Sequence, residues 1–275
     1  MPELPEVETT RRGLEHYLIN QTITKIIVRE PRLRWPVPEE LMQAEQERVQ
    51  ALTRRGKYLI LHTAAGSAII HLGMSGCLRV CIENTPAQKH DHLDMLFSNH
   101  LCLRFTDPRR FGSWLWTKDD PLLHRLIIHL GPEPLMDEFN ANYLYQRTRS
   151  TRRAIKEVIM DSRVVVGVGN IYAAESLFRA GIHPLQEAKK ISYSRYKKLI
   201  TAIKEILAYA IQRGGTTLRD FLNTDGKPGY FKQELQVYGR AGKLCLICGK
   251  KLLLIRLQNR ATVYCPLCQK YRPNS

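Results

Sequence analysis

The chain opens with hydrophobic positions at helical spacing. Four apolar residues fall roughly on one face of a helix: Leu4, Val7, Leu14 and Leu18. Pro2 stands at the edge of this segment and acidic residues fill the first turn, which is typical of a helix N-terminus. We therefore predict an amphipathic helix from Glu3 to about Leu18.

The next hundred residues alternate between apolar and polar positions in short runs. Leu101–Phe105 reads apolar-polar in this way, and turn-forming residues such as those at 98–100 separate the runs. The strand-like segments are Ile23–Arg29, Lys57–His62, Ala68–Leu72, Cys77–Ile82, Leu93–Phe97, Leu101–Phe105 and Ser113–Thr117. This spacing predicts an antiparallel β-sandwich or barrel.

The pattern changes at residues 130–134, whose sequence LGPEP contains two prolines and one glycine and is typical of a linker. Helical spacing follows over residues 140–161, 171–180, 192–213 and 216–222, and the glycine-rich segment 167–170 joins two of these helices. After Tyr230 the chain becomes a basic, cysteine-containing tail of short strands. We expect an α+β protein with a β-rich N-terminal domain and a helical domain that carries a small metal module.

The composition fits a folded protein with a sizeable core. The chain has 275 residues, of which 44% are hydrophobic and 25% charged. It has no run of about 18 uncharged apolar residues, so no transmembrane helix is expected. Carboxylates at Glu3 and Glu6 stand where a signal peptide needs a basic start and an apolar run, so we expect a cytoplasmic protein.

The charge balance points to a polyanionic partner. The net charge is +16 and the sequence pI is about 9.7. From Gly226 to the end there are ten Lys or Arg residues and one acid, Glu234, and a second basic stretch spans residues 147–156. Any single run of charge can be a solvated face, and a membrane surface is an alternative partner, but nucleic acid is favoured.

The seven cysteines divide into two groups. Cys77, Cys81 and Cys102 lie in strand-like segments and are expected to be reduced core residues. The other four form two C-x-x-C pairs separated by sixteen residues: Cys245, Cys248, Cys265 and Cys268. This spacing predicts one structural zinc ion held by four thiolates, with disulfides or free thiols as the alternatives.

The segment between the cysteine pairs fits a hairpin whose fold depends on the metal. Its interior contains Arg256 and Arg260, which a hairpin could present to phosphates.

The first residues also carry candidate chemistry. Removal of Met1 would leave Pro2 as a free secondary amine, and an α-amine has a pKa of about 7.7–8.0, so part of it is neutral at physiological pH. A neutral amine can attack an electrophilic sugar carbon and form a Schiff base, and Glu3 could act as general acid or base. The alternative is structural: Pro2 starts a helix, and Glu3 and Glu6 complement its dipole.

Motifs along nearly the whole chain resemble the formamidopyrimidine-DNA glycosylase family, bacterial enzymes that remove oxidised purines from DNA. The resemblance runs from Pro2 to Gln269. The matching segments are PELPEVETTRRGL, RRGKYLI, HLGMSG, KHDH, TDPRRFG, LGPEPL, VVVGVGNIYAAE, GGTTLRDF, DGKPGYFKQELQVYGRAG and RATVYCPLCQ.

The resemblance implies a bifunctional DNA glycosylase and abasic-site lyase. Pro2 matches the family's nucleophile at C1′ of the damaged nucleotide, and Glu3 matches the proton donor that assists sugar-ring opening and base loss. Lys57 matches the acid of β-elimination, which also contacts phosphate. Arg260 matches a phosphate ligand assigned to δ-elimination. Cleavage by this route would leave a one-nucleoside gap with phosphates at both ends.

The resemblance also assigns DNA contacts. Met74, Arg109 and Phe111 match the residues that fill the stack after a base is extruded, and a thioether, a guanidinium plane and an aromatic ring suit that insertion. His90 and Asn170 match phosphate contacts. Without the resemblance, Met74 and Phe111 would be expected in the core, Arg109 in a solvated turn, and His90 equally as a buried structural histidine.

The resemblance implies a particular domain plan. Residues 1–131 would form the catalytic β-sandwich with its flanking helix, 132–236 a helical helix–two-turns–helix DNA-binding domain, and 237–271 a β-hairpin zinc finger. Residues 216–231 match the family's damaged-base loop, which could act as a lid.

Three positions depart from the family's pattern. Ser162 stands where many relatives carry glutamine or asparagine, and Asn259 where glycine is common. Residues 150–153 replace a lysine-rich run, and Arg152 is the expected phosphate contact there.

Two other functions stay open. The sister family, endonuclease VIII, uses the same N-terminal chemistry on oxidised pyrimidines, but its start usually reads PEGPEI and it lacks the phenylalanine of DPRRFG. A catalytically silent, zinc-containing DNA-binding protein would not need Pro2, Glu3, Lys57 or Arg260. The expected partner is damaged double-stranded DNA, with no membrane, no protein partner and a monomeric chain.

Overall fold

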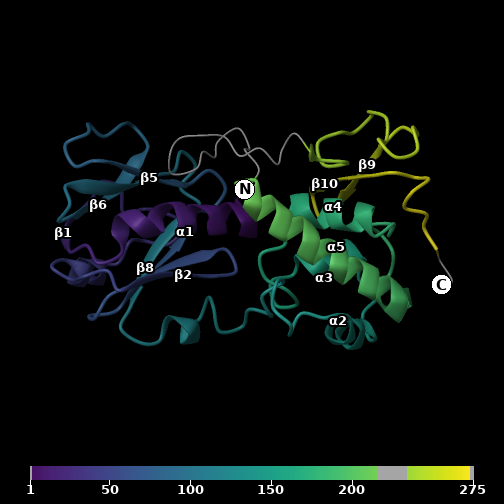
Figure 1. Cartoon of the computed structure of the whole chain (residues 1–275), viewed down its shortest axis with the longest axis horizontal. Coiled ribbons are helices and arrows are strands. Elements are labelled where there is room, and N and C mark those ends of the chain that lie inside the picture. The colour runs from purple at the N-terminus through teal and green to yellow at the C-terminus, as the bar shows by residue number, and fades with distance from the viewer. Residues whose placement is uncertain (1, 216–233, 273–275) are drawn as a thin grey trace. The chain divides into compact units, whose positions relative to one another are not determined.

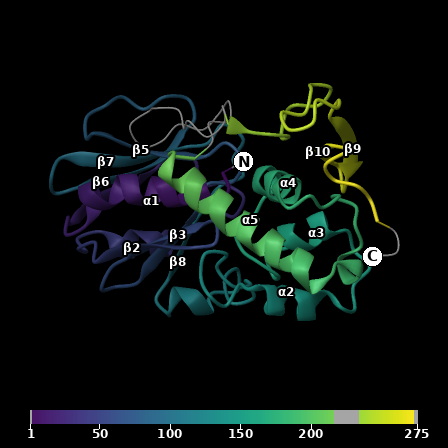
Figure 2. The same ribbon diagram turned by 45° about the vertical axis from the view of Figure 1, so that its right-hand side comes forward.

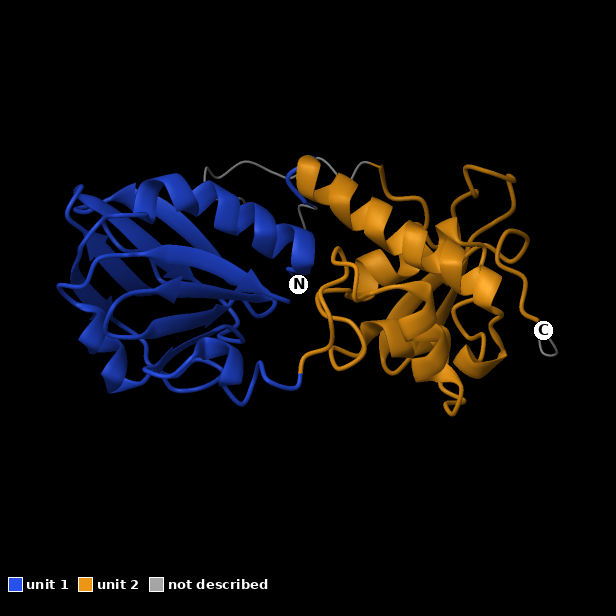
Figure 3. Cartoon of the chain, turned by 60° about the horizontal axis from the view of Figure 1, so that its bottom comes forward, with its two compact units in different colours: residues 1–129, 213–232 blue, residues 130–212, 233–275 orange. Residues whose placement is uncertain are grey.

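The computed structural model describes residues 2–215 and 234–272. The chain divides into two compact units, drawn in blue and orange in Figure 3. Unit 1 comprises residues 1–129 and 213–232, and unit 2 comprises residues 130–212 and 233–275. The predicted helix over residues 216–222 and the predicted base loop over 216–231 lie outside the described residues.

Unit 1 is a sandwich of two four-stranded sheets in which all strand pairs are antiparallel. The first sheet has the order β1-β6-β7-β5, with β1 (Ile23–Val28), β6 (Asp91–Phe97), β7 (Leu101–Thr106) and β5 (Cys77–Ile82). The second has the order β2-β3-β4-β8, with β2 (Ala51–Arg55), β3 (Tyr58–His62), β4 (Ser67–His71) and β8 (Ser113–Thr117). Short 3-10 helices occupy η1 (Glu39–Ala44) and η2 (Pro121–Leu123). The predicted sandwich is confirmed.

The sequence pattern missed one strand, β2. It lies at the edge of its sheet, and of its five residues only Leu52 is buried. An edge strand with charged residues lacks the apolar alternation by which a strand is recognised.

Helix α1 (Leu4–Leu18) lies along the side of the sandwich, where it contacts β2 and β3 of one sheet and β5 of the other (Figures 1 and 2). Its apolar stripe is fully buried, as the hydrophobic spacing predicts. The stripe joins a core that includes Phe105 and Trp114 from the sheets. The helix is therefore fixed on the sandwich by hydrophobic packing.

Unit 2 is helical. Its elements are α2 (Ala141–Thr148), α3 (Ile155–Met160), α4 (Asn170–Arg179), η3 (Ala188–Lys190) and α5 (Tyr193–Gln212). Helix α5 packs against α2 and α4, and α3 packs against α4. Within the described residues, no helix has both the length and the apolar character needed to cross a membrane.

The single helix expected over residues 140–161 is wrong, because the chain leaves the helical path between α2 and α3. There the backbone N–H of Ile155 donates to the Gln186 carbonyl (2.8 Å), and the N–H of Ala188 donates to the Arg153 carbonyl (3.0 Å). Backbone bonds to a distant segment thus replace those of a continuing helix. The interruption is a tertiary effect that local spacing does not encode.

The C-terminal part forms a hairpin of β9 (Leu253–Leu257) and β10 (Arg260–Tyr264), as expected for short strands. The hairpin does not stand alone: Val263 and Leu252 share a core with Ala174 and Phe178 of α4. The hairpin is therefore held partly by the helical unit.

A buried carboxylate fastens the segment that leads into the hairpin. Glu175 in α4 is 3% exposed. Its two oxygens accept hydrogen bonds from three consecutive backbone N–H groups, those of Gln236, Val237 and Tyr238, at 2.8–2.9 Å. Without the Glu175 carboxylate, these N–H groups would lose their hydrogen-bond acceptor in a region that water does not reach.

We expect Glu175→Ala to lower the free energy of unfolding by about 3 kcal/mol, because three N–H groups lose their acceptor. Urea denaturation measures this change. Glu205→Ala is the matched control, since the Glu205 side chain is 50% exposed and forms a surface ion pair with Arg179, and this substitution should cost less than about 1 kcal/mol. Equal effects of the two substitutions would contradict the role of Glu175.

Candidate functional site

The first two residues that carry candidate chemistry are buried at the start of α1. Pro2 is buried and Glu3 is 2% exposed. Glu3 caps the helix: its side chain accepts from the backbone N–H of Glu6, and the Glu6 carboxylate accepts from the backbone N–H of Glu3 at 2.8 Å. The capping box fixes the carboxylate of Glu3 at the N-terminus of α1, one residue after Pro2. The structural interpretation of Glu3 is thus correct, and it leaves the chemical one open.

Lys57 lies in the two-residue turn between β2 and β3. Gly56 has φ +58°, which suits the first position of such a turn, and Lys57 occupies the second position. Arg54 ties this turn to α1, since its guanidinium donates to the Gly56 carbonyl (2.9 Å) and to the Glu8 carboxylate (3.0 Å). The helix that begins beside Pro2 and the turn that carries Lys57 are therefore linked through one arginine.

A neutral histidine lies at the end of β4 near Lys57. The rings of His71 and Tyr58 are 4.9 Å apart, and Nδ1 of His71 accepts from the backbone N–H of Gly73 (3.0 Å). Burial, together with the nearby charges of Lys57 and Arg34, lowers the pKa of His71 to about 4. Neither His71 nor Arg34 was predicted as a site residue, because no spacing in the sequence marks either one.

The residues expected to fill the DNA stack lie on two neighbouring loops. Met74 is on the β4–β5 loop and Phe111 on the β7–β8 loop, and each loop crosses from one sheet to the other. Met74 is 39% exposed and Phe111 43% exposed, so neither is a core residue. The Arg109 guanidinium lies 4.9 Å from the centre of the Phe111 ring. These three side chains therefore share one corner of unit 1.

His90 is brought to the same corner. Its carbonyl accepts the backbone N–H of Asp107 (3.0 Å), the first residue of the β7–β8 loop. Its ring is half-buried and lies 6.3 Å from that of His92.

Unit 2 gathers a second set of polar groups. The N–Hs at Nζ of Lys156 donate to Oδ1 of Asn170 and to Oγ1 of Thr262, both at 2.7 Å, and Lys156 is only 1% exposed. Nδ2 of Asn170 donates to the Ala261 carbonyl (3.1 Å). Asn170 is the first residue of α4, and Thr262 lies in β10. Lys156 thus joins the helix N-terminus to the hairpin, a role that its basic sequence neighbourhood had not singled out.

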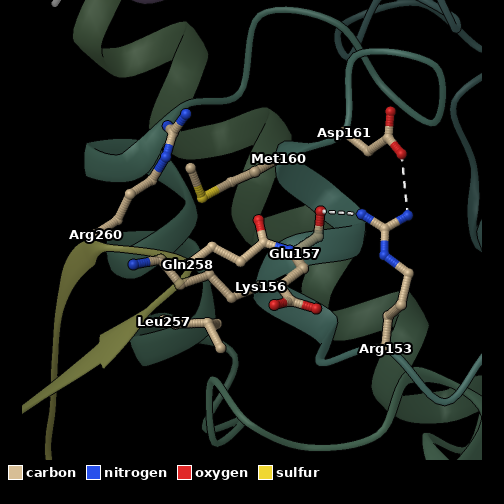
Figure 4. Close-up of a pocket in the computed structure, with 8 residues that line it drawn as sticks. All are labelled: Arg153, Lys156, Glu157, Met160, Asp161, Leu257, Gln258 and Arg260. Atoms are coloured by element: carbon tan, nitrogen blue, oxygen red, sulfur yellow. Dashed lines mark hydrogen bonds and ion pairs between the residues drawn. The ribbon is translucent and has the colours of Figure 1, made fainter.

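Arg260 lines a pocket of about 120 Å³ beside α3 (Figure 4). The pocket lies between the hairpin and α3, and the other lining residues are Arg153, Lys156, Glu157, Met160, Asp161, Leu257 and Gln258. In the hairpin turn, Asn259 has φ +59°, a left-handed conformation that asparagine tolerates. The departure from glycine at this position is therefore compatible with the turn.

Arg152 is exposed and does not line this pocket. Its neighbour Arg153 does, and donates to the Asp161 carboxylate (3.0 Å) and to the Glu157 carbonyl (3.2 Å). The structure therefore places Arg153, and not Arg152, in the lining of the pocket that contains Arg260.

The four cysteines of the two C-x-x-C pairs form one cluster, with all sulfur atoms within 4.8 Å of one another. The Cys248 and Cys265 sulfurs are 3.4 Å apart, and those of Cys245 and Cys268 3.9 Å apart. Tetrahedral zinc with Zn–S bonds of about 2.3 Å places its sulfurs about 3.8 Å apart. The cluster can therefore bind a metal ion, and its donors fit zinc.

Comparison with known proteins identifies the family. The model of the formamidopyrimidine-DNA glycosylase N-terminal domain matches residues 1–114, and that of the formamidopyrimidine-DNA glycosylase H2TH domain matches residues 130–222. A formamidopyrimidine-DNA glycosylase from Photobacterium profundum is 55% identical over 98% of this chain and 100% of its own length, and one from Escherichia coli is 54% identical with the same coverage. The chain belongs to the formamidopyrimidine-DNA glycosylase family.

Solved structures agree with this assignment. The MutM (Fpg) protein from Thermus thermophilus superposes with a TM-score of 0.89 at 34% identity, covering 99% of this chain and 100% of that one. Wild-type Fpg from Lactococcus lactis, in a complex with DNA containing N7-benzyl-Fapy-dG, superposes with a TM-score of 0.90 at 37% identity, covering 98% and 100%. The chain therefore has the fold of formamidopyrimidine-DNA glycosylases.

We expect the His71 ring of this glycosylase family member to stay neutral down to about pH 4, because its pKa is lowered to about 4 from 6.5. Between these values the unfolded chain takes up a proton that the folded chain does not, so stability falls as the pH drops from about 6.5 to about 4, by at most about 1.4 kcal/mol per pH unit. NMR of the labelled histidine rings and urea denaturation at pH 7 and 5 measure both effects. A ring that titrates near pH 6.5 would contradict this expectation.

Proposed function

We propose that this chain removes oxidised purines from duplex DNA through a Schiff base on Pro2 and then cleaves the abasic strand by β,δ-elimination. Membership of the family makes it a DNA glycosylase of base excision repair. The observation that carries the mechanism is the intact N-terminal Pro2-Glu3 pair, held at a helix start in a chain 55% identical to formamidopyrimidine-DNA glycosylases along their whole length.

The chemistry begins with removal of Met1, because only a free Pro2 amine can attack. The neutral nitrogen attacks C1′ of the damaged nucleotide, the bond from C1′ to the base breaks, and the proton that the nitrogen loses goes to the departing base. The nitrogen lone pair then expels the ring oxygen from C1′, which opens the sugar and gives an iminium. Glu3 supplies the proton that the opening ring oxygen takes up. Burial of both residues keeps water away from this step.

The two eliminations use cations. Lys57, at the tip of its turn, donates a proton in β-elimination and contacts the neighbouring phosphate. Arg260, the first residue of β10, binds the phosphate that leaves in δ-elimination, where a guanidinium can form two hydrogen bonds to its oxygens. Free Pro2 is regenerated when water hydrolyses the iminium of the released sugar fragment.

DNA binding uses groups from both units. Met74, Arg109 and Phe111 fill the stack from which the damaged base is extruded, which offsets an unstacking cost of a few kcal/mol. His90 contacts phosphate from unit 1. Asn170 contacts it from the N-terminus of α4, where the helix dipole favours an anion.

Arg152 is the proposed phosphate contact in the basic stretch between α2 and α3, and Arg153 is the alternative. The buried Lys156 adds positive charge beneath Asn170, which strengthens the anion site at the start of α4.

We further propose the architecture and partners that go with this activity. Residues 1–131 form the catalytic domain, 132–236 the helix–two-turns–helix domain and 237–271 the zinc finger, in which the four cysteines hold one structural zinc ion. Four thiolates leave no open coordination position, so the metal supports the hairpin that carries Arg260. The protein acts as a monomer on damaged double-stranded DNA in the bacterial cytoplasm.

Borohydride trapping tests the proposed nucleophile. With a duplex containing 8-oxoguanine opposite cytosine, we expect a covalent adduct that mass spectrometry maps to Pro2, because borohydride reduces the iminium to a stable amine. Pro2→Gly retains an α-amine, which is primary instead of secondary, and should trap more weakly, and protein that retains Met1 should not trap at Pro2.

A second duplex distinguishes the sister function. A Lactococcus lactis Fpg structure is described as a complex with DNA containing an oxidised pyrimidine, so a duplex with an oxidised pyrimidine belongs in the same experiment. An adduct on the oxidised-pyrimidine duplex alone would indicate that the protein acts on oxidised pyrimidines, as the sister family does. Intact DNA binding without an adduct on either duplex, with Met1 removed, would indicate a catalytically silent protein.

We expect zinc removal to abolish DNA binding while unit 1 stays folded, because the metal holds the hairpin and therefore Arg260. Cys265→Ser should have the same effect. Metal content, electrophoretic mobility shift and circular dichroism measure the outcome, and Cys81→Ser, a cysteine outside the cluster, is the matched control. Full activity of the zinc-free protein would refute the structural role of the metal.

A further inference from the structure

The two loops that carry Met74 and Phe111 are neighbours because of the sheet topology. In one sheet, the end of β4 pairs with the start of β8, His71 opposite Ser113. In the other sheet, the start of β5 pairs with the end of β7, Cys77 opposite Thr106. The β4–β5 loop and the β7–β8 loop therefore cross between the same two sheet corners in opposite directions.

The backbones of these loops touch. Gly73 has φ +66°, and a Cβ atom there would lie 2.4 Å from the backbone nitrogen of Gly112. A Cβ atom on Gly112 would lie 2.9 Å from the His71 carbonyl oxygen. Only glycine fits at either position without a shift of the facing backbone, so the two loops form one closely packed pair.

One carboxylate joins this pair. Asp107, the first residue of the β7–β8 loop, is fully buried. Its Oδ1 accepts from the hydroxyl of Ser75 in the other loop (2.7 Å) and from the backbone N–H of Arg109 (3.3 Å), and its Oδ2 accepts from the backbone N–H of Gly112 (2.7 Å). The Ser75 hydroxyl oxygen in turn accepts from the N–H of Arg109 at 3.3 Å.

These bonds span the residues proposed to enter the DNA stack. Within its own loop Asp107 accepts from the backbone of Arg109 itself and from Gly112, the residue after Phe111. In the other loop it accepts from Ser75, the residue after Met74. Within the described residues, the only hydrogen-bond donors to the carboxylate of Asp107 are these N–H and O–H groups of the loops. Removal of the carboxylate would leave the Gly112 N–H and the Ser75 O–H without this acceptor, and the Arg109 N–H with Ser75 Oγ alone.

We propose that Asp107, acting through Ser75, is a positioning residue that sets the discrimination of the base opposite the lesion. The inference rests on the proposed function, in which Arg109 and Phe111 fill the place of the extruded base and therefore lie against the base that had paired with it. An exposed thioether, guanidinium and ring can distinguish two opposite bases only if their approach is fixed, because a side chain free to shift fits the wrong base as well.

The chemistry of the substitutions predicts a graded effect. In Asp107→Asn an NH2 group replaces one of the two carboxylate oxygens. This NH2 group must face either the Gly112 N–H, which is also a donor, or the Ser75 hydroxyl, which can accept a hydrogen bond. The NH2 group therefore faces Ser75, the side-chain oxygen keeps the bond to Gly112, and the bond from the Arg109 N–H to Asp107 is lost, which leaves that N–H with Ser75 Oγ as its acceptor. Ser75→Ala removes the two hydrogen bonds that the Ser75 hydroxyl forms to the other loop, the one donated to Asp107 and the one accepted from the Arg109 N–H. Ser67→Ala is the matched control, since Ser67 is a buried serine of β4 that bonds to His62 and not to either loop.

The experiment compares single-turnover excision of 8-oxoguanine opposite cytosine and opposite adenine. We expect the ratio of the two rates to fall about tenfold in Asp107→Asn and about threefold in Ser75→Ala, and to be unchanged in Ser67→Ala. Strand cleavage at a preformed abasic site opposite cytosine, which needs no base excision, should change less than about threefold in all three. Hydrogen exchange of residues 72–76 and 107–112 in the free protein should accelerate in the first two variants only.

The outcomes separate the inference from the proposed function. An unchanged ratio in folded Asp107→Asn and Ser75→Ala would overturn the inference alone. A uniform loss of excision and abasic-site cleavage would also overturn it, since a merely structural role predicts that result. Absence of excision on both duplexes by the unaltered protein would overturn the proposed function, and the inference with it.

Discussion

A buried carboxylate is stable only while donors surround it, and this constraint recurs in both units. Asp107 in unit 1 and Glu175 in unit 2 are each almost fully buried, and each accepts backbone N–H groups from a segment that has no regular structure of its own. Because loss of one donor leaves a charged oxygen without water, the donors are held together as a set. The β7–β8 loop and the segment that leads into the hairpin are irregular, and these hydrogen bonds fix them to the sheets and helices that support them.

The same logic places positive charge. The ammonium group of Lys156 is buried between Asn170 and Thr262, and the guanidinium of Arg54 lies between α1 and the turn of Lys57. Each cation bridges two elements far apart in sequence: Lys156 donates to Asn170 and Thr262, and Arg54 donates to Glu8 and to the Gly56 carbonyl, one residue before Lys57. Burial is tolerated because every N–H described here finds an oxygen, and the field of the charge still reaches the neighbouring site. His71 is the complement: it stays neutral, so it adds no further repulsion beside Lys57 and Arg34.

The capping box at Glu3 shows that a structural and a chemical role can share one side chain. A carboxylate that caps α1 is fixed in position by the helix N–H groups, and a fixed carboxylate is a better proton donor or acceptor for a neighbouring amine than a mobile one. The structural interpretation of the N-terminus therefore does not compete with catalysis by Pro2. It supplies the geometry that the proposed reaction requires.

Local sequence determined the elements with strong periodicity or fixed spacing: α1, most strands of the sandwich, and the cysteine pairs, whose sulfurs form one cluster. It failed where a contact with a distant segment overrides local preference. The helix over 140–161 is interrupted by pairing with residues 186–188, and edge strand β2 has too few buried positions to be recognised. Family resemblance named Met74 and Phe111, but only the tertiary structure decided that they are exposed, and only it joined Asp107 to Ser75 across 32 residues and Lys156 to Thr262 across 106. The physical reason is that hydrogen bonding and burial depend on which segments contact one another in space, and the periodicity of residues along the chain does not specify those contacts.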